Sequence, residues 1–167
     1  MFRTWAVALI WATSTLAAVA QTPAIKKRFP GWEVEVEKDR FGGPSRVVAV
    51  TVKDATGLAV RCLRGELSLA VIEFTFGQGR FNEGLLLDVK FRADGKEIIE
   101  SKAFALDDKG FQLEKSHSLV RTMLGSKEYA LRISYRGTTY DRIFPARGGD
   151  KAIVEMLKEC PLDEKAD

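Results

Sequence analysis

The stretch Asp150-Lys-Ala-Ile-Val-Glu-Met-Leu-Lys-Glu-Cys160 decides how this chain is expected to fold. Asp150 is a residue type that caps helix N-termini, and its carboxylate favours the positive end of the helix dipole. Pro161 follows the cysteine and cannot continue a helix. The apolar side of this helix is expected to consist of Ile153, Val154, Met156 and Leu157. The stretch therefore predicts a C-terminal helix that is followed closely by a thiol.

The chain holds two cysteines, Cys62 and Cys160. In an exported protein two cysteines most simply form a pair, and this pair would fix the C-terminal helix to a β-sheet. Closing a loop of about a hundred residues would stabilise the fold by ~4–5 kcal/mol in the chain-entropy model. Two free thiols and an intermolecular bridge are the alternatives. The wide spacing excludes a CxxC redox motif, and two thiols with a single histidine make a poor zinc site.

Residues 1–20 have the pattern of a cleaved signal peptide. Arg3 supplies the positive start, Trp5 to Val19 is uncharged and mostly apolar, and Ala18-Val19-Ala20 offers small residues before a cleavage point. An uncleaved membrane anchor is the alternative, but the uncharged stretch is short of the ~20 strongly apolar residues that a span needs. We therefore expect a periplasmic or secreted protein with no stable membrane insertion after cleavage.

The mature chain is expected to be close to neutral. Loss of Arg3 lowers the formal net charge from +3 to +2, that is +3 − 1, which does not favour a nucleic acid as partner. The basic cluster Lys26-Lys27-Arg28 is interpreted as a solvated part of an N-terminal leader at 21–31, with a partner-binding arm as the alternative. A single domain is expected over 32–160, followed by a flexible charged tail at 161–167.

The domain is predicted to be mainly antiparallel β-sheet. Trp32–Glu37 alternates apolar and acidic residues, which is typical of a half-buried strand. Strand-like segments recur at about ten-residue spacing with turn residues between them, a pattern that favours a β-sandwich. We expect Val48, Val50 and Val52 to face the core, and a short internal helix over 116–124. Further strands are expected at 58–63, 67–76, 85–91, 97–106, 111–113, 128–135 and 139–144.

Two surfaces are candidate binding sites. The loop from residue 76 to 81 combines two glycines with aromatic residues and an arginine, and is either a flexible hairpin connection or a recognition loop. The last predicted hairpin carries several arginines on what we expect to be its outer surface, which could attract an acidic partner. The candidate binding residues are Phe76, Gln78, Arg80, Phe81, Arg132 and Arg142.

No catalytic residue, cofactor or metal site is predicted. His117 stands between Ser116 and Ser118, but adjacent side chains on a helix diverge and no GxSxG motif is present, so a capping or surface role is favoured. The glutamates of 32–37 point straight out from one strand and cannot converge on one ion. The paired aspartates at 107–108 lack the further oxygen ligands of a calcium loop and are interpreted as turn residues.

Several short motifs resemble those of known exported proteins. They are Val60-Arg-Cys62, the strand at 85–91 with its Asp-Gly turn, the helix ending Met123-Leu124-Gly125, and the closing run from Phe144 and Gly148 to Cys160. This pattern resembles the small exported proteins of the type VI secretion-associated VasI family and, more distantly, the invasion-associated locus B family, over roughly residues 32–160. The resemblance implies a periplasmic β-sandwich with a disulfide-tied C-terminal helix and no enzymatic activity.

The function expected from these observations is that of a non-catalytic exported binding or accessory protein of the bacterial envelope, of a secretion- or virulence-associated kind, with a protein partner. The alternatives are a periplasmic protein inhibitor of a hydrolase, or a hydrolase that would need His117 to meet a carboxylate and a hydroxyl. A carrier of lipids or small ligands would need a hollow interior, against which the many large apolar side chains argue. The sequence does not predict an oligomeric state.

Overall fold

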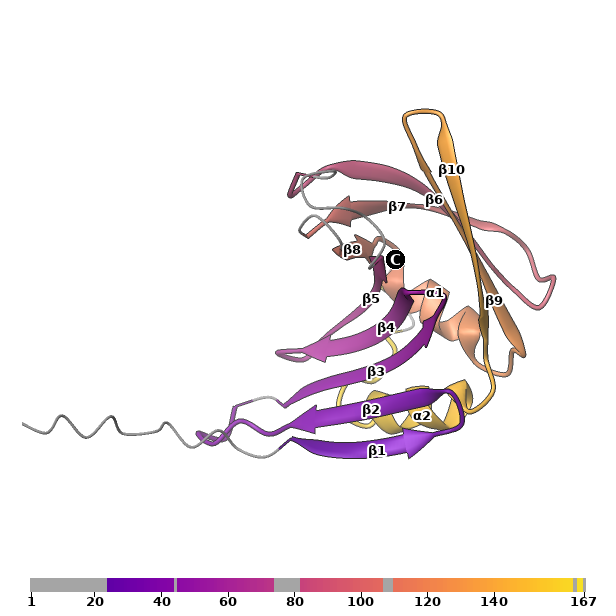
Figure 1. Ribbon diagram of the computed structural model, residues 1–167. Coiled ribbons are helices and arrows are strands. Elements are labelled where there is room, and N and C mark those ends of the chain that lie inside the picture. The colour runs from indigo at the N-terminus through magenta and orange to yellow at the C-terminus, as the bar shows by residue number, and fades with distance from the viewer. Residues whose placement is uncertain (1–23, 44, 74–81, 107–109, 164, 167) are drawn as a thin grey trace, which may run out of the picture.

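The structure, a computed structural model, describes residues 24–43, 45–73, 82–106, 110–163 and 165–166; the predicted signal peptide lies outside them. Within these ranges ten strands form one sheet in the order β1-β2-β3-β4-β5-β8-β7-β6-β9-β10 (Figure 1). The sheet is strongly curved, so that β10, at one end of the order, comes back to contact β3. The strands are β1 (Ile25–Phe29), β2 (Trp32–Glu37), β3 (Arg46–Lys53), β4 (Thr56–Leu63), β5 (Glu66–Glu73), β6 (Leu86–Ala93), β7 (Ile99–Ala105), β8 (Gly110–Leu113), β9 (Glu128–Tyr135) and β10 (Thr138–Pro145).

The mainly antiparallel β class and the two helices are confirmed, whereas the predicted sandwich is not. The ten strands are hydrogen-bonded into one open sheet rather than into two stacked sheets. Most sheet neighbours are also neighbours in sequence, but β5 pairs with β8 and β6 pairs with β9 across long connections. The spacing of strands along the chain reveals that strands exist; it does not reveal these two pairings.

Three hairpins are joined by two-residue turns in which both residues have positive φ. They are the β3–β4 turn Asp54-Ala55, the β4–β5 turn Arg64-Gly65 and the β9–β10 turn Arg136-Gly137. Two successive positive φ values define the type I′ turn, whose twist matches that of the flanking strands and which favours glycine at its second position. These turns explain why consecutive strands pair directly.

One face of the sheet, called here the inner face, is buried from β2 to β9. The register places Val34 opposite Ala49, Ala49 opposite Val60, and Val60 opposite Leu69, so apolar side chains from successive strands stand in rows. The largest fully buried side chains on this face include Leu58, Leu69, Phe91, Phe111, Leu113, Tyr129, Leu131 and Phe144. The opposite, outer face carries the charged side chains of the alternating pattern.

The side chains of β3 that face the core are the ones that were predicted to lie on the opposite face. Val47 and Ala49 are fully buried, while Val52 is 59% exposed. The prediction of Val48, Val50 and Val52 as the core face was therefore wrong. Because β3 carries apolar residues on both faces, alternation alone does not choose between them; the pairing with β2 and β4 does.

Helix α2 (Gly149–Leu157) packs on β1 to β4, and α1 (Ser116–Met123) packs on β5 and β6 (Figure 1). The buried side of α2 is formed by Ala152, Ile153 and Met156, whereas Val154, predicted to be on that side, is 52% exposed. Neither helix of the described residues is long and apolar enough to cross a membrane.

The predicted cap of α2 is also wrong. Gly148 occupies the N-cap position, and no side chain caps the helix. Asp150 lies in the first turn, where its Oδ1 accepts the backbone N–H of Gly125 at 2.8 Å. Asp150 thus connects the start of α2 to the residues that follow α1, while its charge still lies near the positive end of the helix dipole.

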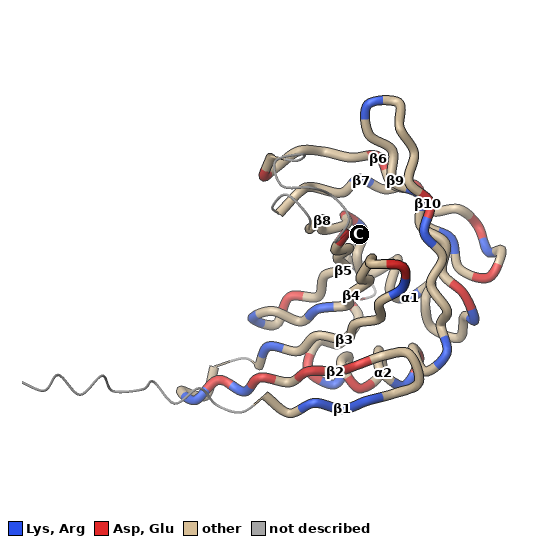
Figure 2. Tube along the Cα trace, in the orientation of Figure 1, with Lys and Arg blue, Asp and Glu red and all other residues tan. Residues whose placement is uncertain are grey.

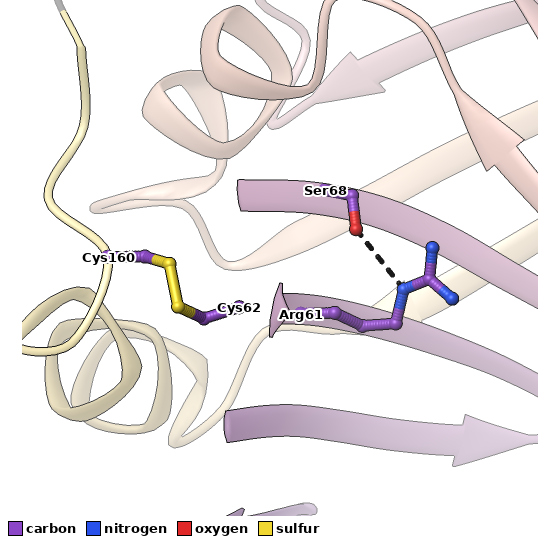
Figure 3. Close-up of a disulfide and its surroundings, with 4 residues drawn as sticks. All are labelled: Arg61, Cys62, Ser68 and Cys160. Carbon is purple, nitrogen blue, oxygen red and sulfur yellow. Dashed lines mark hydrogen bonds between the residues drawn. A yellow bond between two sulfur atoms is a disulfide. The ribbon is translucent and has the colours of Figure 1, made fainter. Parts of the chain in front are cut away.

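The predicted disulfide is confirmed. Cys62 on β4 and Cys160 after α2 are bonded across a separation of 98 residues, with Cα atoms 5.8 Å apart (Figure 3). The neighbouring Arg61 points to the outer face, where its Nε donates to Ser68 Oγ at 3.2 Å and its Nη2 to Gln112 Oε1 at 2.6 Å. Burial lowers the pKa of Arg61. The disulfide thus holds α2 on the inner face, while Arg61 joins three strands on the outer one.

Part of the predicted leader is the edge strand β1, which is held by ion pairs. Lys26 Nζ lies 3.4 Å from Glu33 Oε1, so the basic residues of β1 face acidic ones of β2 (Figure 2). Lys27 pairs with Glu155 of α2. Hydrogen bonds from Lys158 and then Lys27 lower the pKa of Glu155 to about 2. Lysines on an edge strand also discourage pairing with other chains.

The start of α2 lies close to two buried aromatic side chains. A Cβ atom added to Gly149 would lie 2.8 Å from Tyr129 Oη and 3.1 Å from Trp32 Nε1. The two rings meet edge to face at a centroid distance of 6.3 Å. Burial raises the pKa of Tyr129. Glycine at this position therefore lets the helix approach the sheet closely.

Replacing Gly149 by alanine is expected to lower the free energy of unfolding by about 1–3 kcal/mol, because the added methyl group overpacks this contact. Urea denaturation followed by tryptophan fluorescence measures the change. The control is Lys151→Ala, at an exposed position of the same helix, for which a change within about 0.5 kcal/mol is expected. Equal stability of the two variants would contradict the packing argument.

Candidate functional site

The structure does not bring the predicted binding residues together on one surface. Arg132 and Arg142 lie on opposite faces of the β9–β10 hairpin, because Arg132 is paired with Asp141 and Leu131 with Arg142. The prediction that both arginines form one basic outer surface is therefore wrong. The remaining candidates lie outside the described residues: Phe76, Gln78, Arg80 and Phe81.

Arg142 faces inward and joins the edge strand β10 to two strands in the middle of the curved sheet. Its Nη2 lies 2.8 Å from Glu73 Oε2, and its Nε donates to Thr56 Oγ1 at 2.7 Å. Thr56 Oγ1 donates in turn to Glu73 Oε2 at 2.8 Å. Glu73 is 1% exposed, so its charge depends on these partners. This cluster connects β10 to β4 and β5 and has a structural role.

Arg132 lies on the outer face and is held by a bidentate pair with Asp141. The two hydrogen bonds, Nε to Oδ1 and Nη2 to Oδ2, are both 2.7 Å long. The hydrogen bond from Arg132 lowers the pKa of Asp141, and the same bond raises the pKa of Arg132. Both side chains are more than half exposed, so the pair contributes little to stability but fixes the orientation of the guanidinium group.

A groove of about 340 Å³ lies beside this pair on the outer face of β6, β9 and β10. Ala130 is paired with Arg92 of β6 on one side and with Ile143 of β10 on the other. A short side chain between two long ones produces a hollow, since cross-strand neighbours stand about 5 Å apart. Ile98 lines the same groove; it is 50% exposed and Ile143 is 47% exposed. The groove thus combines an apolar lining with an adjacent arginine.

Two of the basic side chains around the groove form ion pairs with neighbouring carboxylates. Lys90 Nζ lies 2.8 Å from Glu100 Oε1, and Arg132 is paired with Asp141. Arg92 is exposed, and no carboxylate pairs with it within the part of the chain that the structure describes. The groove therefore offers a guanidinium group that can receive an external carboxylate.

A second hollow on the same face is a weaker candidate. It covers about 560 Å³ and is lined mainly by charged residues of β6 and β7. Lys90 pairs there with Glu100, and Lys102 with Asp88. Since these charges compensate one another, this surface offers less to a ligand than the groove over Ala130.

The serine and histidine of α1 make structural hydrogen bonds. Ser116 Oγ donates to Leu113 O at 2.7 Å and accepts the backbone N–H of Leu69 at 2.9 Å, so it joins β8 to β5 rather than capping the helix. Its predicted capping role is wrong, since the N-cap position is Lys115. His117 Nδ1 accepts the backbone N–H of Asp163 at 3.1 Å, which fixes the residues after the disulfide on α1.

Of the residues that line the groove, the sequence predicted Arg132 and Arg142 as binding residues. It did not predict Arg92, Ile98, Ala130 and Ile143, which come from β6, the β6–β7 connection, β9 and β10, and which meet through the pairing of β6 with β9 and of β9 with β10. The available signal was the alternation of β9, which puts a small residue on the outer face among larger ones. Among the described residues, no group of three or more histidines, cysteines, aspartates and glutamates is placed to hold a metal ion.

Comparisons with models of protein families, with curated proteins and with solved structures find no match to this chain.

Proposed function

We propose that this chain is a non-catalytic, exported binding protein of the bacterial envelope and that a partner protein meets the groove over Ala130. The observation that carries the proposal is the apolar lining of Ile98 and Ile143 next to Arg92, which has no carboxylate partner among the described residues. Exposed apolar side chains that cluster in a groove favour an interaction site, and arginine is enriched at such sites.

The disulfide supports the extracytoplasmic part of the proposal. Structural disulfides persist in oxidising compartments and are rare in the cytosol. The predicted signal peptide at residues 1–20 and the resemblance to the VasI and locus B families lead to the same compartment. An accessory role in secretion or virulence is the finer form of this proposal.

A protein inhibitor of an envelope hydrolase is the second candidate. The β9–β10 hairpin projects beyond the neighbouring strands, and Arg136 at its tip lies 5.2 Å from the centre of the Tyr135 ring (Figure 1). A projecting, ordered hairpin is a form that inhibitors use to enter active sites. This candidate requires that the captured partner be a hydrolase whose turnover falls when the purified protein is added.

Site-specific photo-crosslinking in the native cells tests the proposal. A photoreactive amino acid replaces Ile143 beside the groove, and in a separate strain it replaces the similarly exposed Val154 on α2. A discrete crosslinked protein is expected from position 143, and its yield should fall at least tenfold when Ala130→Leu fills the hollow. Identical products from both positions, or none from position 143, would reject the groove as the partner site.

A further inference from the structure

We infer that the groove recognises a protein segment that places one apolar side chain over Ala130 and a neighbouring carboxylate on Arg92. This inference rests on the proposed function and specifies the chemistry of its partner. The reasons come from the shape of the groove, from the charges at its rim and from its size.

The shape of the groove fits a side chain of leucine size. Ala130 lies between Arg92 and Ile143 in adjacent strands, so the two long side chains stand about 10 Å apart with a methyl group between them. Ile98 and Ile143 are each about half exposed and can be covered by an apolar group that enters this space. A polar side chain there would lose hydration without gaining a hydrogen bond from these residues.

The charges of the rim select an acidic neighbour. Lys90 and Arg132 already have carboxylate partners in Glu100 and Asp141. Arg92 has none among the described residues, and a guanidinium group binds a carboxylate through two parallel hydrogen bonds. A segment with a basic residue at this place would meet like charge, so charge complementarity favours aspartate or glutamate.

The size of the groove favours a protein segment over other ligands. At about 340 Å³ it is at the lower end of small-molecule sites, and it lies on the outer face of the sheet rather than in the core. A segment can continue along that face and bury additional surface. A nucleic acid would need several unpaired cations along its backbone, whereas the described lining offers Arg92.

The experiment selects peptides from a random dodecapeptide library displayed on phage against the full disulfide-bonded chain. Enriched peptides are expected to share an apolar residue next to aspartate or glutamate. Their affinity, measured by fluorescence polarisation with synthetic copies, should fall at least tenfold for Arg92→Glu and for Ala130→Leu. Replacing the peptide's acidic residue by lysine should restore binding to Arg92→Glu while abolishing binding to the wild type.

Matched variants separate recognition from folding. Ser134→Leu adds the same side chain to the same face of β9 outside the groove, and Arg64→Glu reverses a charge in the β4–β5 turn; both should bind peptides like the wild type. Arg92→Gln removes the charge without reversing it, and it provides a second test that does not depend on the folding of Arg92→Glu. Each variant is compared with the wild type by near-ultraviolet circular dichroism.

The outcomes distinguish this inference from the proposed function. If position 143 crosslinks a partner but peptide binding is unchanged in Arg92→Glu and Arg92→Gln, the acidic recognition is overturned and the proposed function stands. A library without any groove-dependent binder also overturns it. Decanoate that binds as tightly as the peptides, with the same loss in both groove variants, would show a small-molecule site instead. Failure of both the crosslinking and the peptide selection rejects both proposals.

Discussion

Replacing Cys160 by serine is expected to lower the free energy of unfolding by about 4 kcal/mol. The bond to Cys62 closes a loop with a separation of 98 residues, so its removal greatly enlarges the conformational freedom of the unfolded chain. Loss of this bond also leaves α2 held on β1 to β4 by packing and by the Lys27–Glu155 ion pair. Urea denaturation of the oxidised wild type and of the variant, followed by tryptophan fluorescence, measures the difference.

The wild type treated with a reductant is the internal control for this result. It should unfold at the urea concentration of the Cys160→Ser variant, because both lack the same constraint. The double variant Cys62→Ser with Cys160→Ser should match them as well. A loss below about 1 kcal/mol in all three would show that the bond adds little to the fold.

Replacing Arg142 by alanine is expected to lower the free energy of unfolding by about 3 kcal/mol. Glu73 is 1% exposed, and the substitution would remove the Arg142 guanidinium that compensates the charge of its buried carboxylate. The hydrogen bond from Thr56 remains, but a neutral hydroxyl compensates a buried charge only in part. Arg142→Ala combined with Glu73→Gln should recover much of the loss, because the second substitution removes the charge.

Arg132→Ala is the matched control for this prediction. This variant truncates an arginine on the outer face of the same hairpin, where Arg132 and Asp141 are both more than half exposed. Exposed pairs contribute roughly 0–1 kcal/mol, so Arg132→Ala should be several times less destabilising than Arg142→Ala. Similar losses from both variants would contradict the structural role of the inward cluster.

Local sequence patterns predicted the elements of this fold well. Alternation placed β2 at Trp32–Glu37 and β9 at Glu128–Tyr135, which are the bounds that the structure has. Strand patterns and turn residues are local properties, because they depend on neighbours in the chain. The disulfide followed from counting two cysteines, given an oxidising compartment.

The arrangement of the strands could not be predicted in the same way. Whether β5 pairs with β8 depends on contacts between segments far apart in sequence, and these contacts make one open sheet. The same limit explains the wrong core face of β3, where Val47 and Val48 are equally apolar and the neighbouring strands choose between them. It also explains Arg142, whose inward position follows from the register of β10 and the curvature of the sheet.

The candidate site was the least predictable part. Ala130 acquires its role from having Arg92 and Ile143 as cross-strand neighbours, and a small residue in a strand gives no sign of this in sequence. Binding residues were instead predicted by their type, as aromatic residues and arginines. That criterion found Arg132 but missed Arg92, and both residues line the groove.

The position of α2 has a consequence for how the chain matures. A polypeptide is synthesised from its amino end, so the strands that α2 covers emerge long before α2 itself. Until then Trp32, Val34 and Val47 have no helix over them. Nascent or truncated chains that stop before Gly149 should therefore be degraded quickly or require a chaperone. Resistance to proteases is expected once an oxidant of the compartment has taken two electrons from the thiols of Cys62 and Cys160 and the disulfide has formed.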